Sequence, residues 1–213
     1  MKPGYRFYRV CYRLVSALSF VFCRLRVIGK DNIPDGAAMV CANHSSIIDP
    51  FLIALAFGIE HQMHIIAKIE LFRIPVVSQI LNKLGMISVD RGVLDAASVK
   101  TTLSYLKNGE KVVIFPEGTR TSEDDAISAK AGAVKTVERT GVPLVPLFIP
   151  RKKALFGGIS VVIGMPYYIE KQTQKRTLDE YTRLSETLME KIKSLNPLLP
   201  VQPIQNSEFG IRN

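Results

Sequence analysis

The sequence predicts an α/β fold, in which a mainly parallel β-sheet is flanked by helices and preceded by an N-terminal amphipathic helical segment that docks on a membrane. Short runs rich in Val and Ile alternate with helical patterns along most of the chain, as parallel sheets require. The 213 residues, 47% of them hydrophobic, are enough for one sizeable core. We therefore expect a membrane-binding segment over residues 1–30, one α/β domain over 31–205 and a tail over 206–213.

The first 30 residues contain seven basic side chains and no acidic one, since the first acid in the chain is Asp31. At about 100° per residue, most of these basic residues fall on one side of a helix and most large apolar residues on the other. The longest uncharged stretch, residues 14–23, has ten residues, against the ~20 that a bilayer span requires. We expect this helix to lie in the membrane interface, with Tyr5, Tyr8 and Tyr12 at headgroup level. The residues expected to contact lipid are Arg6, Phe7, Arg9, Val10, Arg13, Leu14, Leu18 and Phe22.

Two other interpretations of this segment stay open. The uncharged stretch resembles the apolar part of a signal peptide, although no small-residue cleavage site follows it and arginines continue beyond it. Alternatively, the helix packs its apolar face against the rest of the protein.

Six runs rich in Val and Ile end at Gly, Pro or polar residues, which predicts strands. They cover residues 37–44, 63–68, 85–91, 111–118, 142–150 and 159–166. Five further segments have the apolar periodicity of helices, and most of them close on a Gly that can adopt the left-handed cap conformation. They cover residues 50–58, 75–85, 95–109, 129–141 and 178–195. Ligands of such folds gather where strands end, and polar motifs follow several of these strands.

The net charge of +9 favours an anionic partner, which is a nucleic acid, a phospholipid surface or a phosphorylated small molecule. The basic residues near the N-terminus lie on an amphipathic helix and do not alternate with exposed aromatic residues, so we expect lipid and no nucleic acid. The three cysteines form no CxxC pair and no cluster with a histidine, so neither a metal site nor a disulfide framework is expected. The chain is expected in a reducing, cytosolic environment.

The segment CANHSSIIDP, residues 41–50, sets His44 and Asp49 five positions apart between a strand and a helix. Asp49 followed by Pro50 has a sufficient structural explanation as a helix N-cap. The turn can also fold back and bring the Asp49 carboxylate to one nitrogen of the His44 imidazole. Such a contact fixes the tautomer and stabilises the imidazolium, which is what a general base needs.

Four blocks in order resemble the motifs of the glycerolipid acyltransferase family, over about residues 35–150. They are NHSSIID (43–49), GMISVDRG (85–92), FPEGTRT (115–121) and VPLVPLFI (142–149). The resemblance is closest to bacterial enzymes that acylate 1-acylglycerol 3-phosphate, and it implies that residues 31–205 form an acyltransferase domain. His44 is then the base that deprotonates the acceptor hydroxyl, and Asp49 orients His44. The acyl group passes directly to the acceptor, so no cofactor and no metal are implied.

The same resemblance implies the substrates and the place of action. The donor is acyl-carrier protein or acyl-CoA, and the acceptor is lysophosphatidic acid, which becomes phosphatidic acid on the cytoplasmic face of the cell membrane. Glycerol 3-phosphate or another lysophospholipid is an alternative acceptor.

Seven residues are expected to bind substrate. Arg91 and Arg120 offer planar guanidinium groups that match phosphate oxygens, and Gly118 lets the backbone approach a ligand. Glu117 is expected to bond a ligand hydroxyl or to brace an arginine. Thr119, Lys130 and Lys68 complete the expected set.

Ser45 and Ser46 beside His44 also suggest a serine esterase. The sequence has no G-x-S-x-G motif, and adjacent residues seldom face each other, so this interpretation is weaker. A basic nucleic-acid-binding module is the other alternative.

Overall fold

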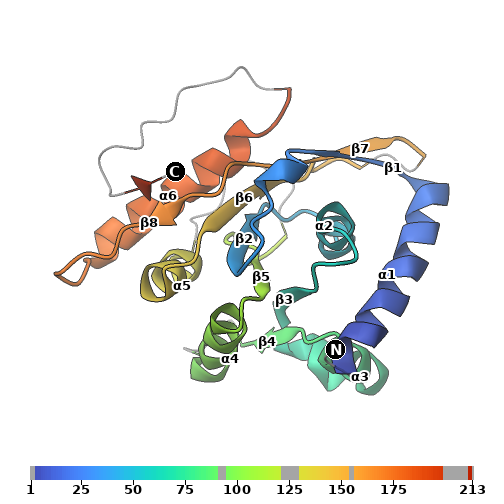
Figure 1. Cartoon of the computed structure of the whole chain (residues 1–213), viewed down its shortest axis with the longest axis horizontal. Helices are drawn as coiled ribbons and strands as arrows, with labels where there is room; N and C mark the ends of the chain where they lie inside the picture. Colours follow the sequence, from blue (N-terminus) through green and yellow to red (C-terminus); the bar gives the residue numbers. More distant parts are fainter. Residues whose placement is uncertain (1–2, 91–94, 121–129, 154–155, 199–210, 213) are drawn as a thin grey trace.

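The computed structural model describes residues 3–90, 95–120, 130–153, 156–198 and 211–212 (Figure 1). Its centre is a seven-stranded sheet in the order β1-β7-β6-β2-β5-β3-β4. All neighbouring strands run parallel except the antiparallel pair β6 and β7. The expected fold class, a mainly parallel sheet flanked by helices, is therefore confirmed.

The sheet contains all six of the expected strands, most of them shorter than predicted. They are β2 (Ala38–Ala42), β3 (Met63–Lys68), β4 (Ile87–Val89), β5 (Lys111–Ile114), β6 (Leu144–Phe148) and β7 (Gly158–Ile163). The five expected helices are α2 (Asp49–Phe57), α3 (Pro75–Lys83), α4 (Ala96–Lys107), α5 (Gly132–Thr140) and α6 (Leu178–Ser194). Short elements that the sequence did not predict are η1 (Lys30–Asn32), η2 (Ile69–Arg73) and the two-stranded ribbon of β8 (Tyr168–Ile169) and β9 (Ile211–Arg212).

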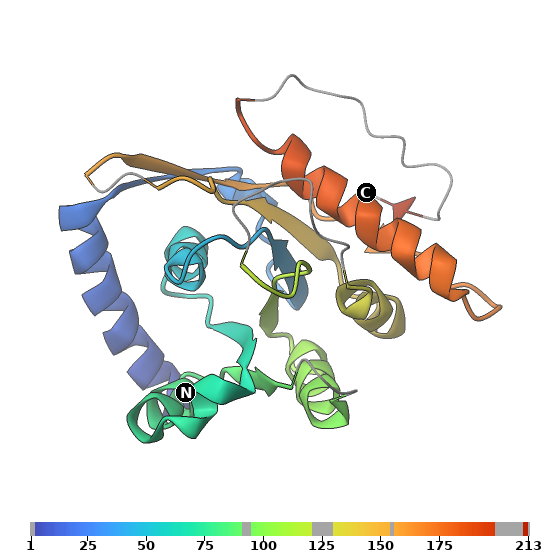
Figure 2. The same ribbon diagram turned by 180° about the vertical axis from the view of Figure 1, so that it is seen from behind.

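The two faces of the sheet carry two separate apolar cores. Successive side chains of a strand point to opposite faces, so Ala38, Val40 and Ala42 of β2 pack with α2, while Met39 and Cys41 pack with α4, α5 and α6. Figures 1 and 2 show α2 on one side of the strands and α5 and α6 on the other. Every residue of β2 is buried, as expected for the central strand of a covered sheet.

The N-terminal helix α1 (Pro3–Phe22) is shorter than the expected segment of residues 1–30. Residues 24–28 fall within the segment expected to be helical, but they form β1 (Arg24–Ile28), an edge strand paired with β7. Along β1 the arginines are exposed and alternate with half-buried Leu25 and Val27, which pack on the core. This period of two suits a strand that covers the core with one face.

The side of α1 that faces the protein is formed by its tyrosines, contrary to the expectation that they reach the lipid headgroups. The hydroxyls of Tyr5 and Tyr8 donate to the backbone carbonyls of Ile59 and His61, and Tyr8 is buried. Val10, Leu14, Leu18 and Val21, on the apolar side, are all more than half exposed. These four side chains are therefore largely open to solvent and are not buried by the rest of the described chain. No helix within the described part of the chain combines the length and the apolar character of a bilayer span.

The parallel strands β2, β5 and β6 bring three distant segments to one end of the sheet, the end at which these strands finish. Because β6, β2 and β5 are neighbours and point the same way, residues 43–49, 115–120 and 149–153 all emerge at their carboxyl ends. Open α/β sheets bind their ligands at this end, beyond the carboxyl ends of the strands.

Candidate active site

Asn43 fastens the loop after β2 to the end of β6. Its side-chain amide donates to the Ile149 carbonyl at 2.7 Å, and its side-chain oxygen accepts from the Ile149 N–H at 2.8 Å. Asn43 is buried, so this reciprocal pair satisfies groups that water does not reach. The backbone that carries His44 is thereby held at a fixed position beside residues 149–153.

His44 and Asp49 form the contact that their spacing suggested, with 2.9 Å between His44 Nδ1 and Asp49 Oδ2. The same carboxylate oxygen accepts the backbone N–H groups of Ser45 and Ser46, at 2.8 and 2.7 Å. Asp49 is the first residue of α2, and its carboxylate bonds the loop before the helix without capping the N–H groups that follow. The helix N-cap interpretation of Asp49 is therefore wrong, and the fold-back interpretation is confirmed.

The Asp49 side chain, which holds this loop, is an ionised carboxylate. Its side chain is 0% exposed, and burial alone raises the pKa of a carboxyl group. The contacts with His44, with Lys153 and with the two serine N–H groups outweigh burial and leave the Asp49 pKa below its ordinary value. An ionised carboxylate only accepts hydrogen bonds, so we assign the proton of the neutral imidazole to Nδ1.

The other ring nitrogen, Nε2, is therefore the one with a lone pair to accept a proton. The His44 side chain is 12% exposed, and its ring stacks on Phe115 with 4.0 Å between the ring centroids. The ring is thus fixed by Asp49 at one edge and by Phe115 on one face. A neutral imidazole held in one tautomer beside a carboxylate can take a proton from a substrate hydroxyl.

Lys153 lies on the far side of Asp49. Its Nζ is 2.8 Å from Asp49 Oδ1, a close ion pair that is not aligned as a hydrogen bond. The ammonium also donates to Ser45 Oγ at 2.7 Å. Lys153 therefore ties the segment after β6 to both ends of the loop from Ser45 to Asp49.

Glu117 braces an arginine, which was one of its two expected roles. Its Oε1 lies 2.8 Å from the guanidinium of Arg151, which also contacts the His44 carbonyl at 3.5 Å. Burial raises the pKa of Glu117, although Arg151 and His44 oppose the shift. The pair of Glu117 and Arg151 joins the loop after β5 to the segment after β6, next to the backbone of His44.

The remaining expected substrate residues that the structure describes lie at the same end of the sheet. Gly118 has a φ of 70°, and a Cβ there would lie 2.9 Å from Lys130 Cε, so a side chain would be strained as well as crowded. Thr119, Arg120 and Lys130 are exposed. Lys68 is the last residue of β3, two strands away from β2. Arg91 lies outside the described residues.

A largely apolar cavity of about 300 Å³ adjoins the loop that carries His44, through Phe115. Among its lining residues are Val99 and Thr102 of α4, Gly118 of the EGTR loop (residues 117–120) and Lys130. Because Phe115 stacks on His44, one ring separates this cavity from the imidazole.

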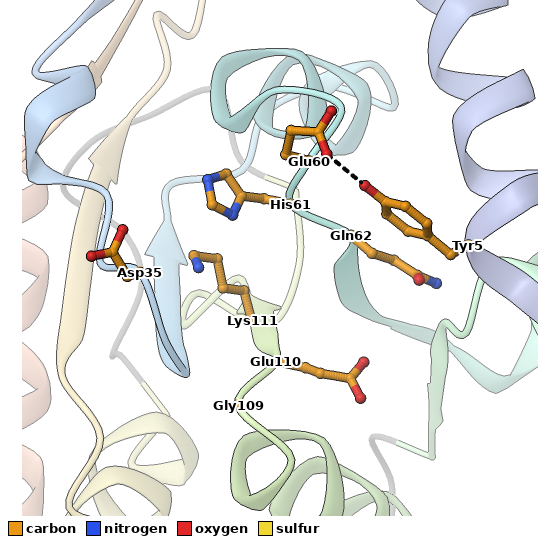
Figure 3. A pocket seen from close by; sticks show the side chains of 8 residues that line it. All are labelled: Tyr5, Asp35, Glu60, His61, Gln62, Gly109, Glu110 and Lys111. Carbon is orange, nitrogen blue, oxygen red and sulfur yellow. Dashed lines mark hydrogen bonds between the residues drawn. The ribbon is translucent and has the colours of Figure 1, made fainter. Parts of the chain in front are cut away.

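A more polar hollow of about 380 Å³ lies at the opposite end of the sheet, where these strands begin. Figure 3 shows its lining, in which the Tyr5 hydroxyl points to Glu60 at 3.1 Å. Apart from Tyr5 of α1, its residues lie just before β2, β3 or β5, or begin β5, so it lies at the amino ends of these strands. It is not part of the His44 site.

Arg151 and Lys153 were missed by the sequence analysis, although a signal was present. The run PRKK, residues 150–153, follows the β6 strand directly, at the strand end where ligands gather. Only the order of the strands reveals that this run faces Asp49 and Glu117.

The hydroxyl groups of Ser45 and Ser46 form hydrogen bonds with groups other than the His44 imidazole. Ser45 Oγ donates to the Arg151 carbonyl at 3.3 Å, and Ser46 Oγ accepts from the Ile48 N–H at 3.4 Å. Among the described residues, neither hydroxyl bonds to the imidazole, as an activated serine nucleophile must. The described residues also contain no group of three or more His, Cys, Asp or Glu side chains placed to hold a metal ion.

Comparison with known proteins points to one family. A family model described as acyltransferase matches residues 24–150, which include all four motifs. The 1-acyl-sn-glycerol-3-phosphate acyltransferase of Bacillus subtilis is 33% identical and aligns over 88% of this chain and 96% of its own length. That of Borreliella burgdorferi is 29% identical, over 88% of this chain and 73% of its own. The solved 1-acyl-sn-glycerophosphate acyltransferase of Thermotoga maritima has a TM-score of 0.66 and 27% identity, over 92% of this chain and 81% of that one.

Proposed function

The chain belongs to the acyltransferase family, and we propose that it transfers an acyl chain from an acyl thioester to the free hydroxyl of 1-acyl-sn-glycerol 3-phosphate, forming phosphatidic acid. The observation that carries the proposal is the contact between His44 Nδ1 and Asp49, which leaves Nε2 as the basic nitrogen. The relatives with this activity named above support the choice of acceptor.

The chemistry follows from the orientation of the imidazole. Nε2 of His44 takes the proton of the acceptor hydroxyl as its oxygen attacks the carbonyl carbon of the thioester. The carbon–sulfur bond then breaks, and the imidazolium returns the proton to the thiolate that leaves. Asp49 stabilises the imidazolium between these steps, because its carboxylate is ionised and buried beside Nδ1.

We assign recognition of the acceptor phosphate to basic residues near the carboxyl ends of the strands. Arg120 is exposed on the loop after β5, and its guanidinium offers paired donors to phosphate oxygens. Arg91 is proposed for the same role from its place in the second motif. Thr119, Lys130 and Lys68 are proposed as further contacts, and Gly118 gives the backbone room to approach the ligand.

The donor is proposed to be acyl-carrier protein or acyl-CoA. The cavity behind Phe115 offers an apolar space next to His44 for the donor chain. No cofactor enters the proposed reaction, because the thioester already supplies the leaving group.

The helix α1 is proposed to hold the enzyme on the cytoplasmic face of the membrane. Its exposed apolar side, formed by Val10, Leu14, Leu18 and Val21, stands beside exposed Arg6 and Arg13. An exposed apolar stripe flanked by arginines suits the interface of an anionic leaflet, where each basic residue adds roughly 1 kcal/mol. Anionic lipid, and not nucleic acid, is therefore the proposed partner of these basic residues.

Membrane docking is tested by co-sedimentation with anionic vesicles. The variant Leu14→Ser with Val21→Ser removes apolar surface from α1 and leaves unchanged the tyrosines that bond the segment from Leu55 to His61. We expect its bound fraction to fall at least about tenfold. Leu178→Ser, which removes an exposed apolar side chain from α6, is the control. Equal vesicle binding by the α1 variant and the wild type would contradict the docking role.

The reaction is tested by mass spectrometry of the products that purified protein forms from each donor and acceptor. Acyl-carrier protein and CoA thioesters are each combined with lysophosphatidic acid, glycerol 3-phosphate and a lysophospholipid that lacks the terminal phosphate. We expect phosphatidic acid as the main product. Acylation of glycerol 3-phosphate alone would contradict the proposed acceptor.

A further inference from the structure

Phe156, on the connection between β6 and β7, has a left-handed backbone conformation. Its φ is 63°, in a region that a bulky residue rarely adopts, and it is the one non-glycine residue with a positive φ in the part of the chain that the structure describes. The side chain is 73% exposed, so burial within the protein does not explain why a phenylalanine is held there. A strained backbone of this kind is typical of a functional contact.

Phe156 is bonded to the C-terminal end of α1. Its N–H donates to the Phe22 carbonyl at 2.8 Å, and the two rings lie with their centroids 5.9 Å apart. The Phe22 side chain is itself 44% exposed. Figures 1 and 2 both show the start of β7 beside this end of α1. Two exposed aromatic rings therefore lie together at one end of the helix that is proposed to dock on the membrane.

The helix α3 lies at the other end of α1 and contains no buried residue. Val76 and Ile80, one turn apart, are 70% and 41% exposed, and Lys83 follows on the same side. The Lys83 ammonium lies 5.6 Å from the centre of the Phe7 ring. Phe7 precedes Leu14 by seven residues, almost two helical turns, so both lie on the apolar side of α1. The exposed side of α3 thus continues the apolar side of α1.

The segments at the two ends of α1 share its charge pattern. Residues 71–83 contain two basic side chains and no acidic one, and residues 150–158 contain three basic side chains and no acidic one, although the chain has 19 acidic residues. Lys83 and Lys152 are exposed. Exposed apolar side chains among basic ones suit an anionic lipid surface, which receives the apolar groups and attracts the charges.

We propose that Phe156 and the exposed side of α3 bind the same anionic lipid surface as α1, so that this helix is anchored at both ends. The inference rests on the proposed docking of α1. A single helix can roll about its own axis on a membrane, whereas contacts at both ends fix the orientation of the whole enzyme. Lys153, whose ammonium lies 2.8 Å from Asp49, is three residues before Phe156. The Phe156 anchor therefore belongs to the same segment that contacts the catalytic aspartate.

The test uses the fact that the sequence contains no tryptophan, so each substitution adds a single fluorophore. Phe156→Trp and Val76→Trp report on the two ends, Leu14→Trp on the middle of α1, and Leu178→Trp on α6 as the control. Each full-length protein is mixed with vesicles of phosphatidylglycerol and phosphatidylcholine, with or without bromine on the acyl chains of the phosphatidylcholine. Bromine quenches only a tryptophan that reaches the acyl region, so the readout does not depend on enzyme activity.

We expect brominated vesicles to quench the Phe156→Trp, Val76→Trp and Leu14→Trp proteins and to leave Leu178→Trp unchanged. If Val76→Trp does not fold, Ile80→Trp takes its place.

Phe156→Gly provides a second measurement, because glycine accepts the positive φ without strain. We expect it to lower the vesicle partition coefficient about tenfold or more, with a urea midpoint no lower than that of wild type. Leu178→Ser is the control for loss of an exposed apolar side chain. Unchanged vesicle binding with a lowered midpoint would show that Phe156 serves folding and would overturn its role as an anchor.

The quenching pattern separates this inference from the docking of α1. Quenching of Leu14→Trp without quenching of Phe156→Trp or of the α3 variant would overturn the anchoring at both ends and leave the docking of α1 in place. Absence of quenching in all of these proteins would refute the docking of α1, and the inference with it.

Discussion

Lys153 lies 2.8 Å from Oδ1 of Asp49, the carboxylate oxygen that His44 does not use. Asp49 is thus held between a base on one side and a fixed positive charge on the other. The ammonium neutralises part of the carboxylate charge that stabilises the imidazolium, and it also fixes the position of the carboxylate. Lys153 is therefore a positioning residue, which acts on the reaction through Asp49.

Replacing Lys153 with Met is expected to lower kcat about tenfold or more, because Asp49 loses a buried partner and the loop loses its link to the segment after β6. Lys153→Arg should restore most of the rate. The neighbour Lys152 is exposed, so Lys152→Met serves as the control. A kcat near the wild-type value for Lys153→Met, or an equal loss in Lys152→Met, would contradict the positioning role.

The lowered pKa of Asp49 predicts a pH dependence of folding. A carboxyl group whose pKa is lower in the folded state than in the unfolded one stabilises the fold above its unfolded pKa. That stability is lost as the pH falls through the folded pKa. Urea unfolding of wild type and Asp49→Asn should therefore differ by a constant free energy above about pH 5, and the difference should shrink below about pH 4. A difference that does not change between pH 7 and pH 3 would contradict the assigned ionisation of Asp49.

Arg120→Ala is expected to raise the KM for the phosphorylated acceptor about tenfold or more, because a charged hydrogen bond to the phosphate is lost. The KM for the thioester donor should change little. Steady-state kinetics with each substrate varied in turn provide the measurement. Arg139→Ala, at an exposed position of α5, is the matched control. An equal rise for both substrates would point to a structural role for the EGTR loop.

Ser45→Ala and Ser46→Ala separate direct acyl transfer from a serine-esterase mechanism. Each variant is expected to keep activity within about tenfold of wild type, because neither hydroxyl bonds to the imidazole in the described structure. Loss of a true nucleophile costs about 10⁴-fold or more. A loss of that size in either variant, together with an acylated serine found by mass spectrometry, would refute direct transfer.

The parts of the site that are close in sequence were predictable, and those that depend on strand order were not. His44 and Asp49 are five residues apart, so one turn decides whether they meet. The pairing of Glu117 with Arg151 joins positions 34 apart, and it requires β5 and β6 to lie on either side of β2. No local pattern specifies that order.

The N-terminal segment illustrates a different limit. A helical projection of the sequence separates apolar from basic residues, but α1 has a third side, on which Tyr5, Tyr8 and Tyr12 bond backbone carbonyls of the segment from Leu55 to His61. Tyrosine suits a lipid interface and a wet protein contact equally well, so composition could not decide between them. Residues 24–28 continued the helical pattern, and only pairing with β7 makes them a strand.

The most direct test of the account is the turnover of His44→Ala with lysophosphatidic acid and an acyl thioester, followed by detection of phosphatidic acid. The account predicts a kcat at least ~10²-fold below wild type, with a circular dichroism spectrum and a urea midpoint close to those of wild type. A folded His44→Ala protein that forms phosphatidic acid at a near-normal rate would contradict the role of His44 as the general base.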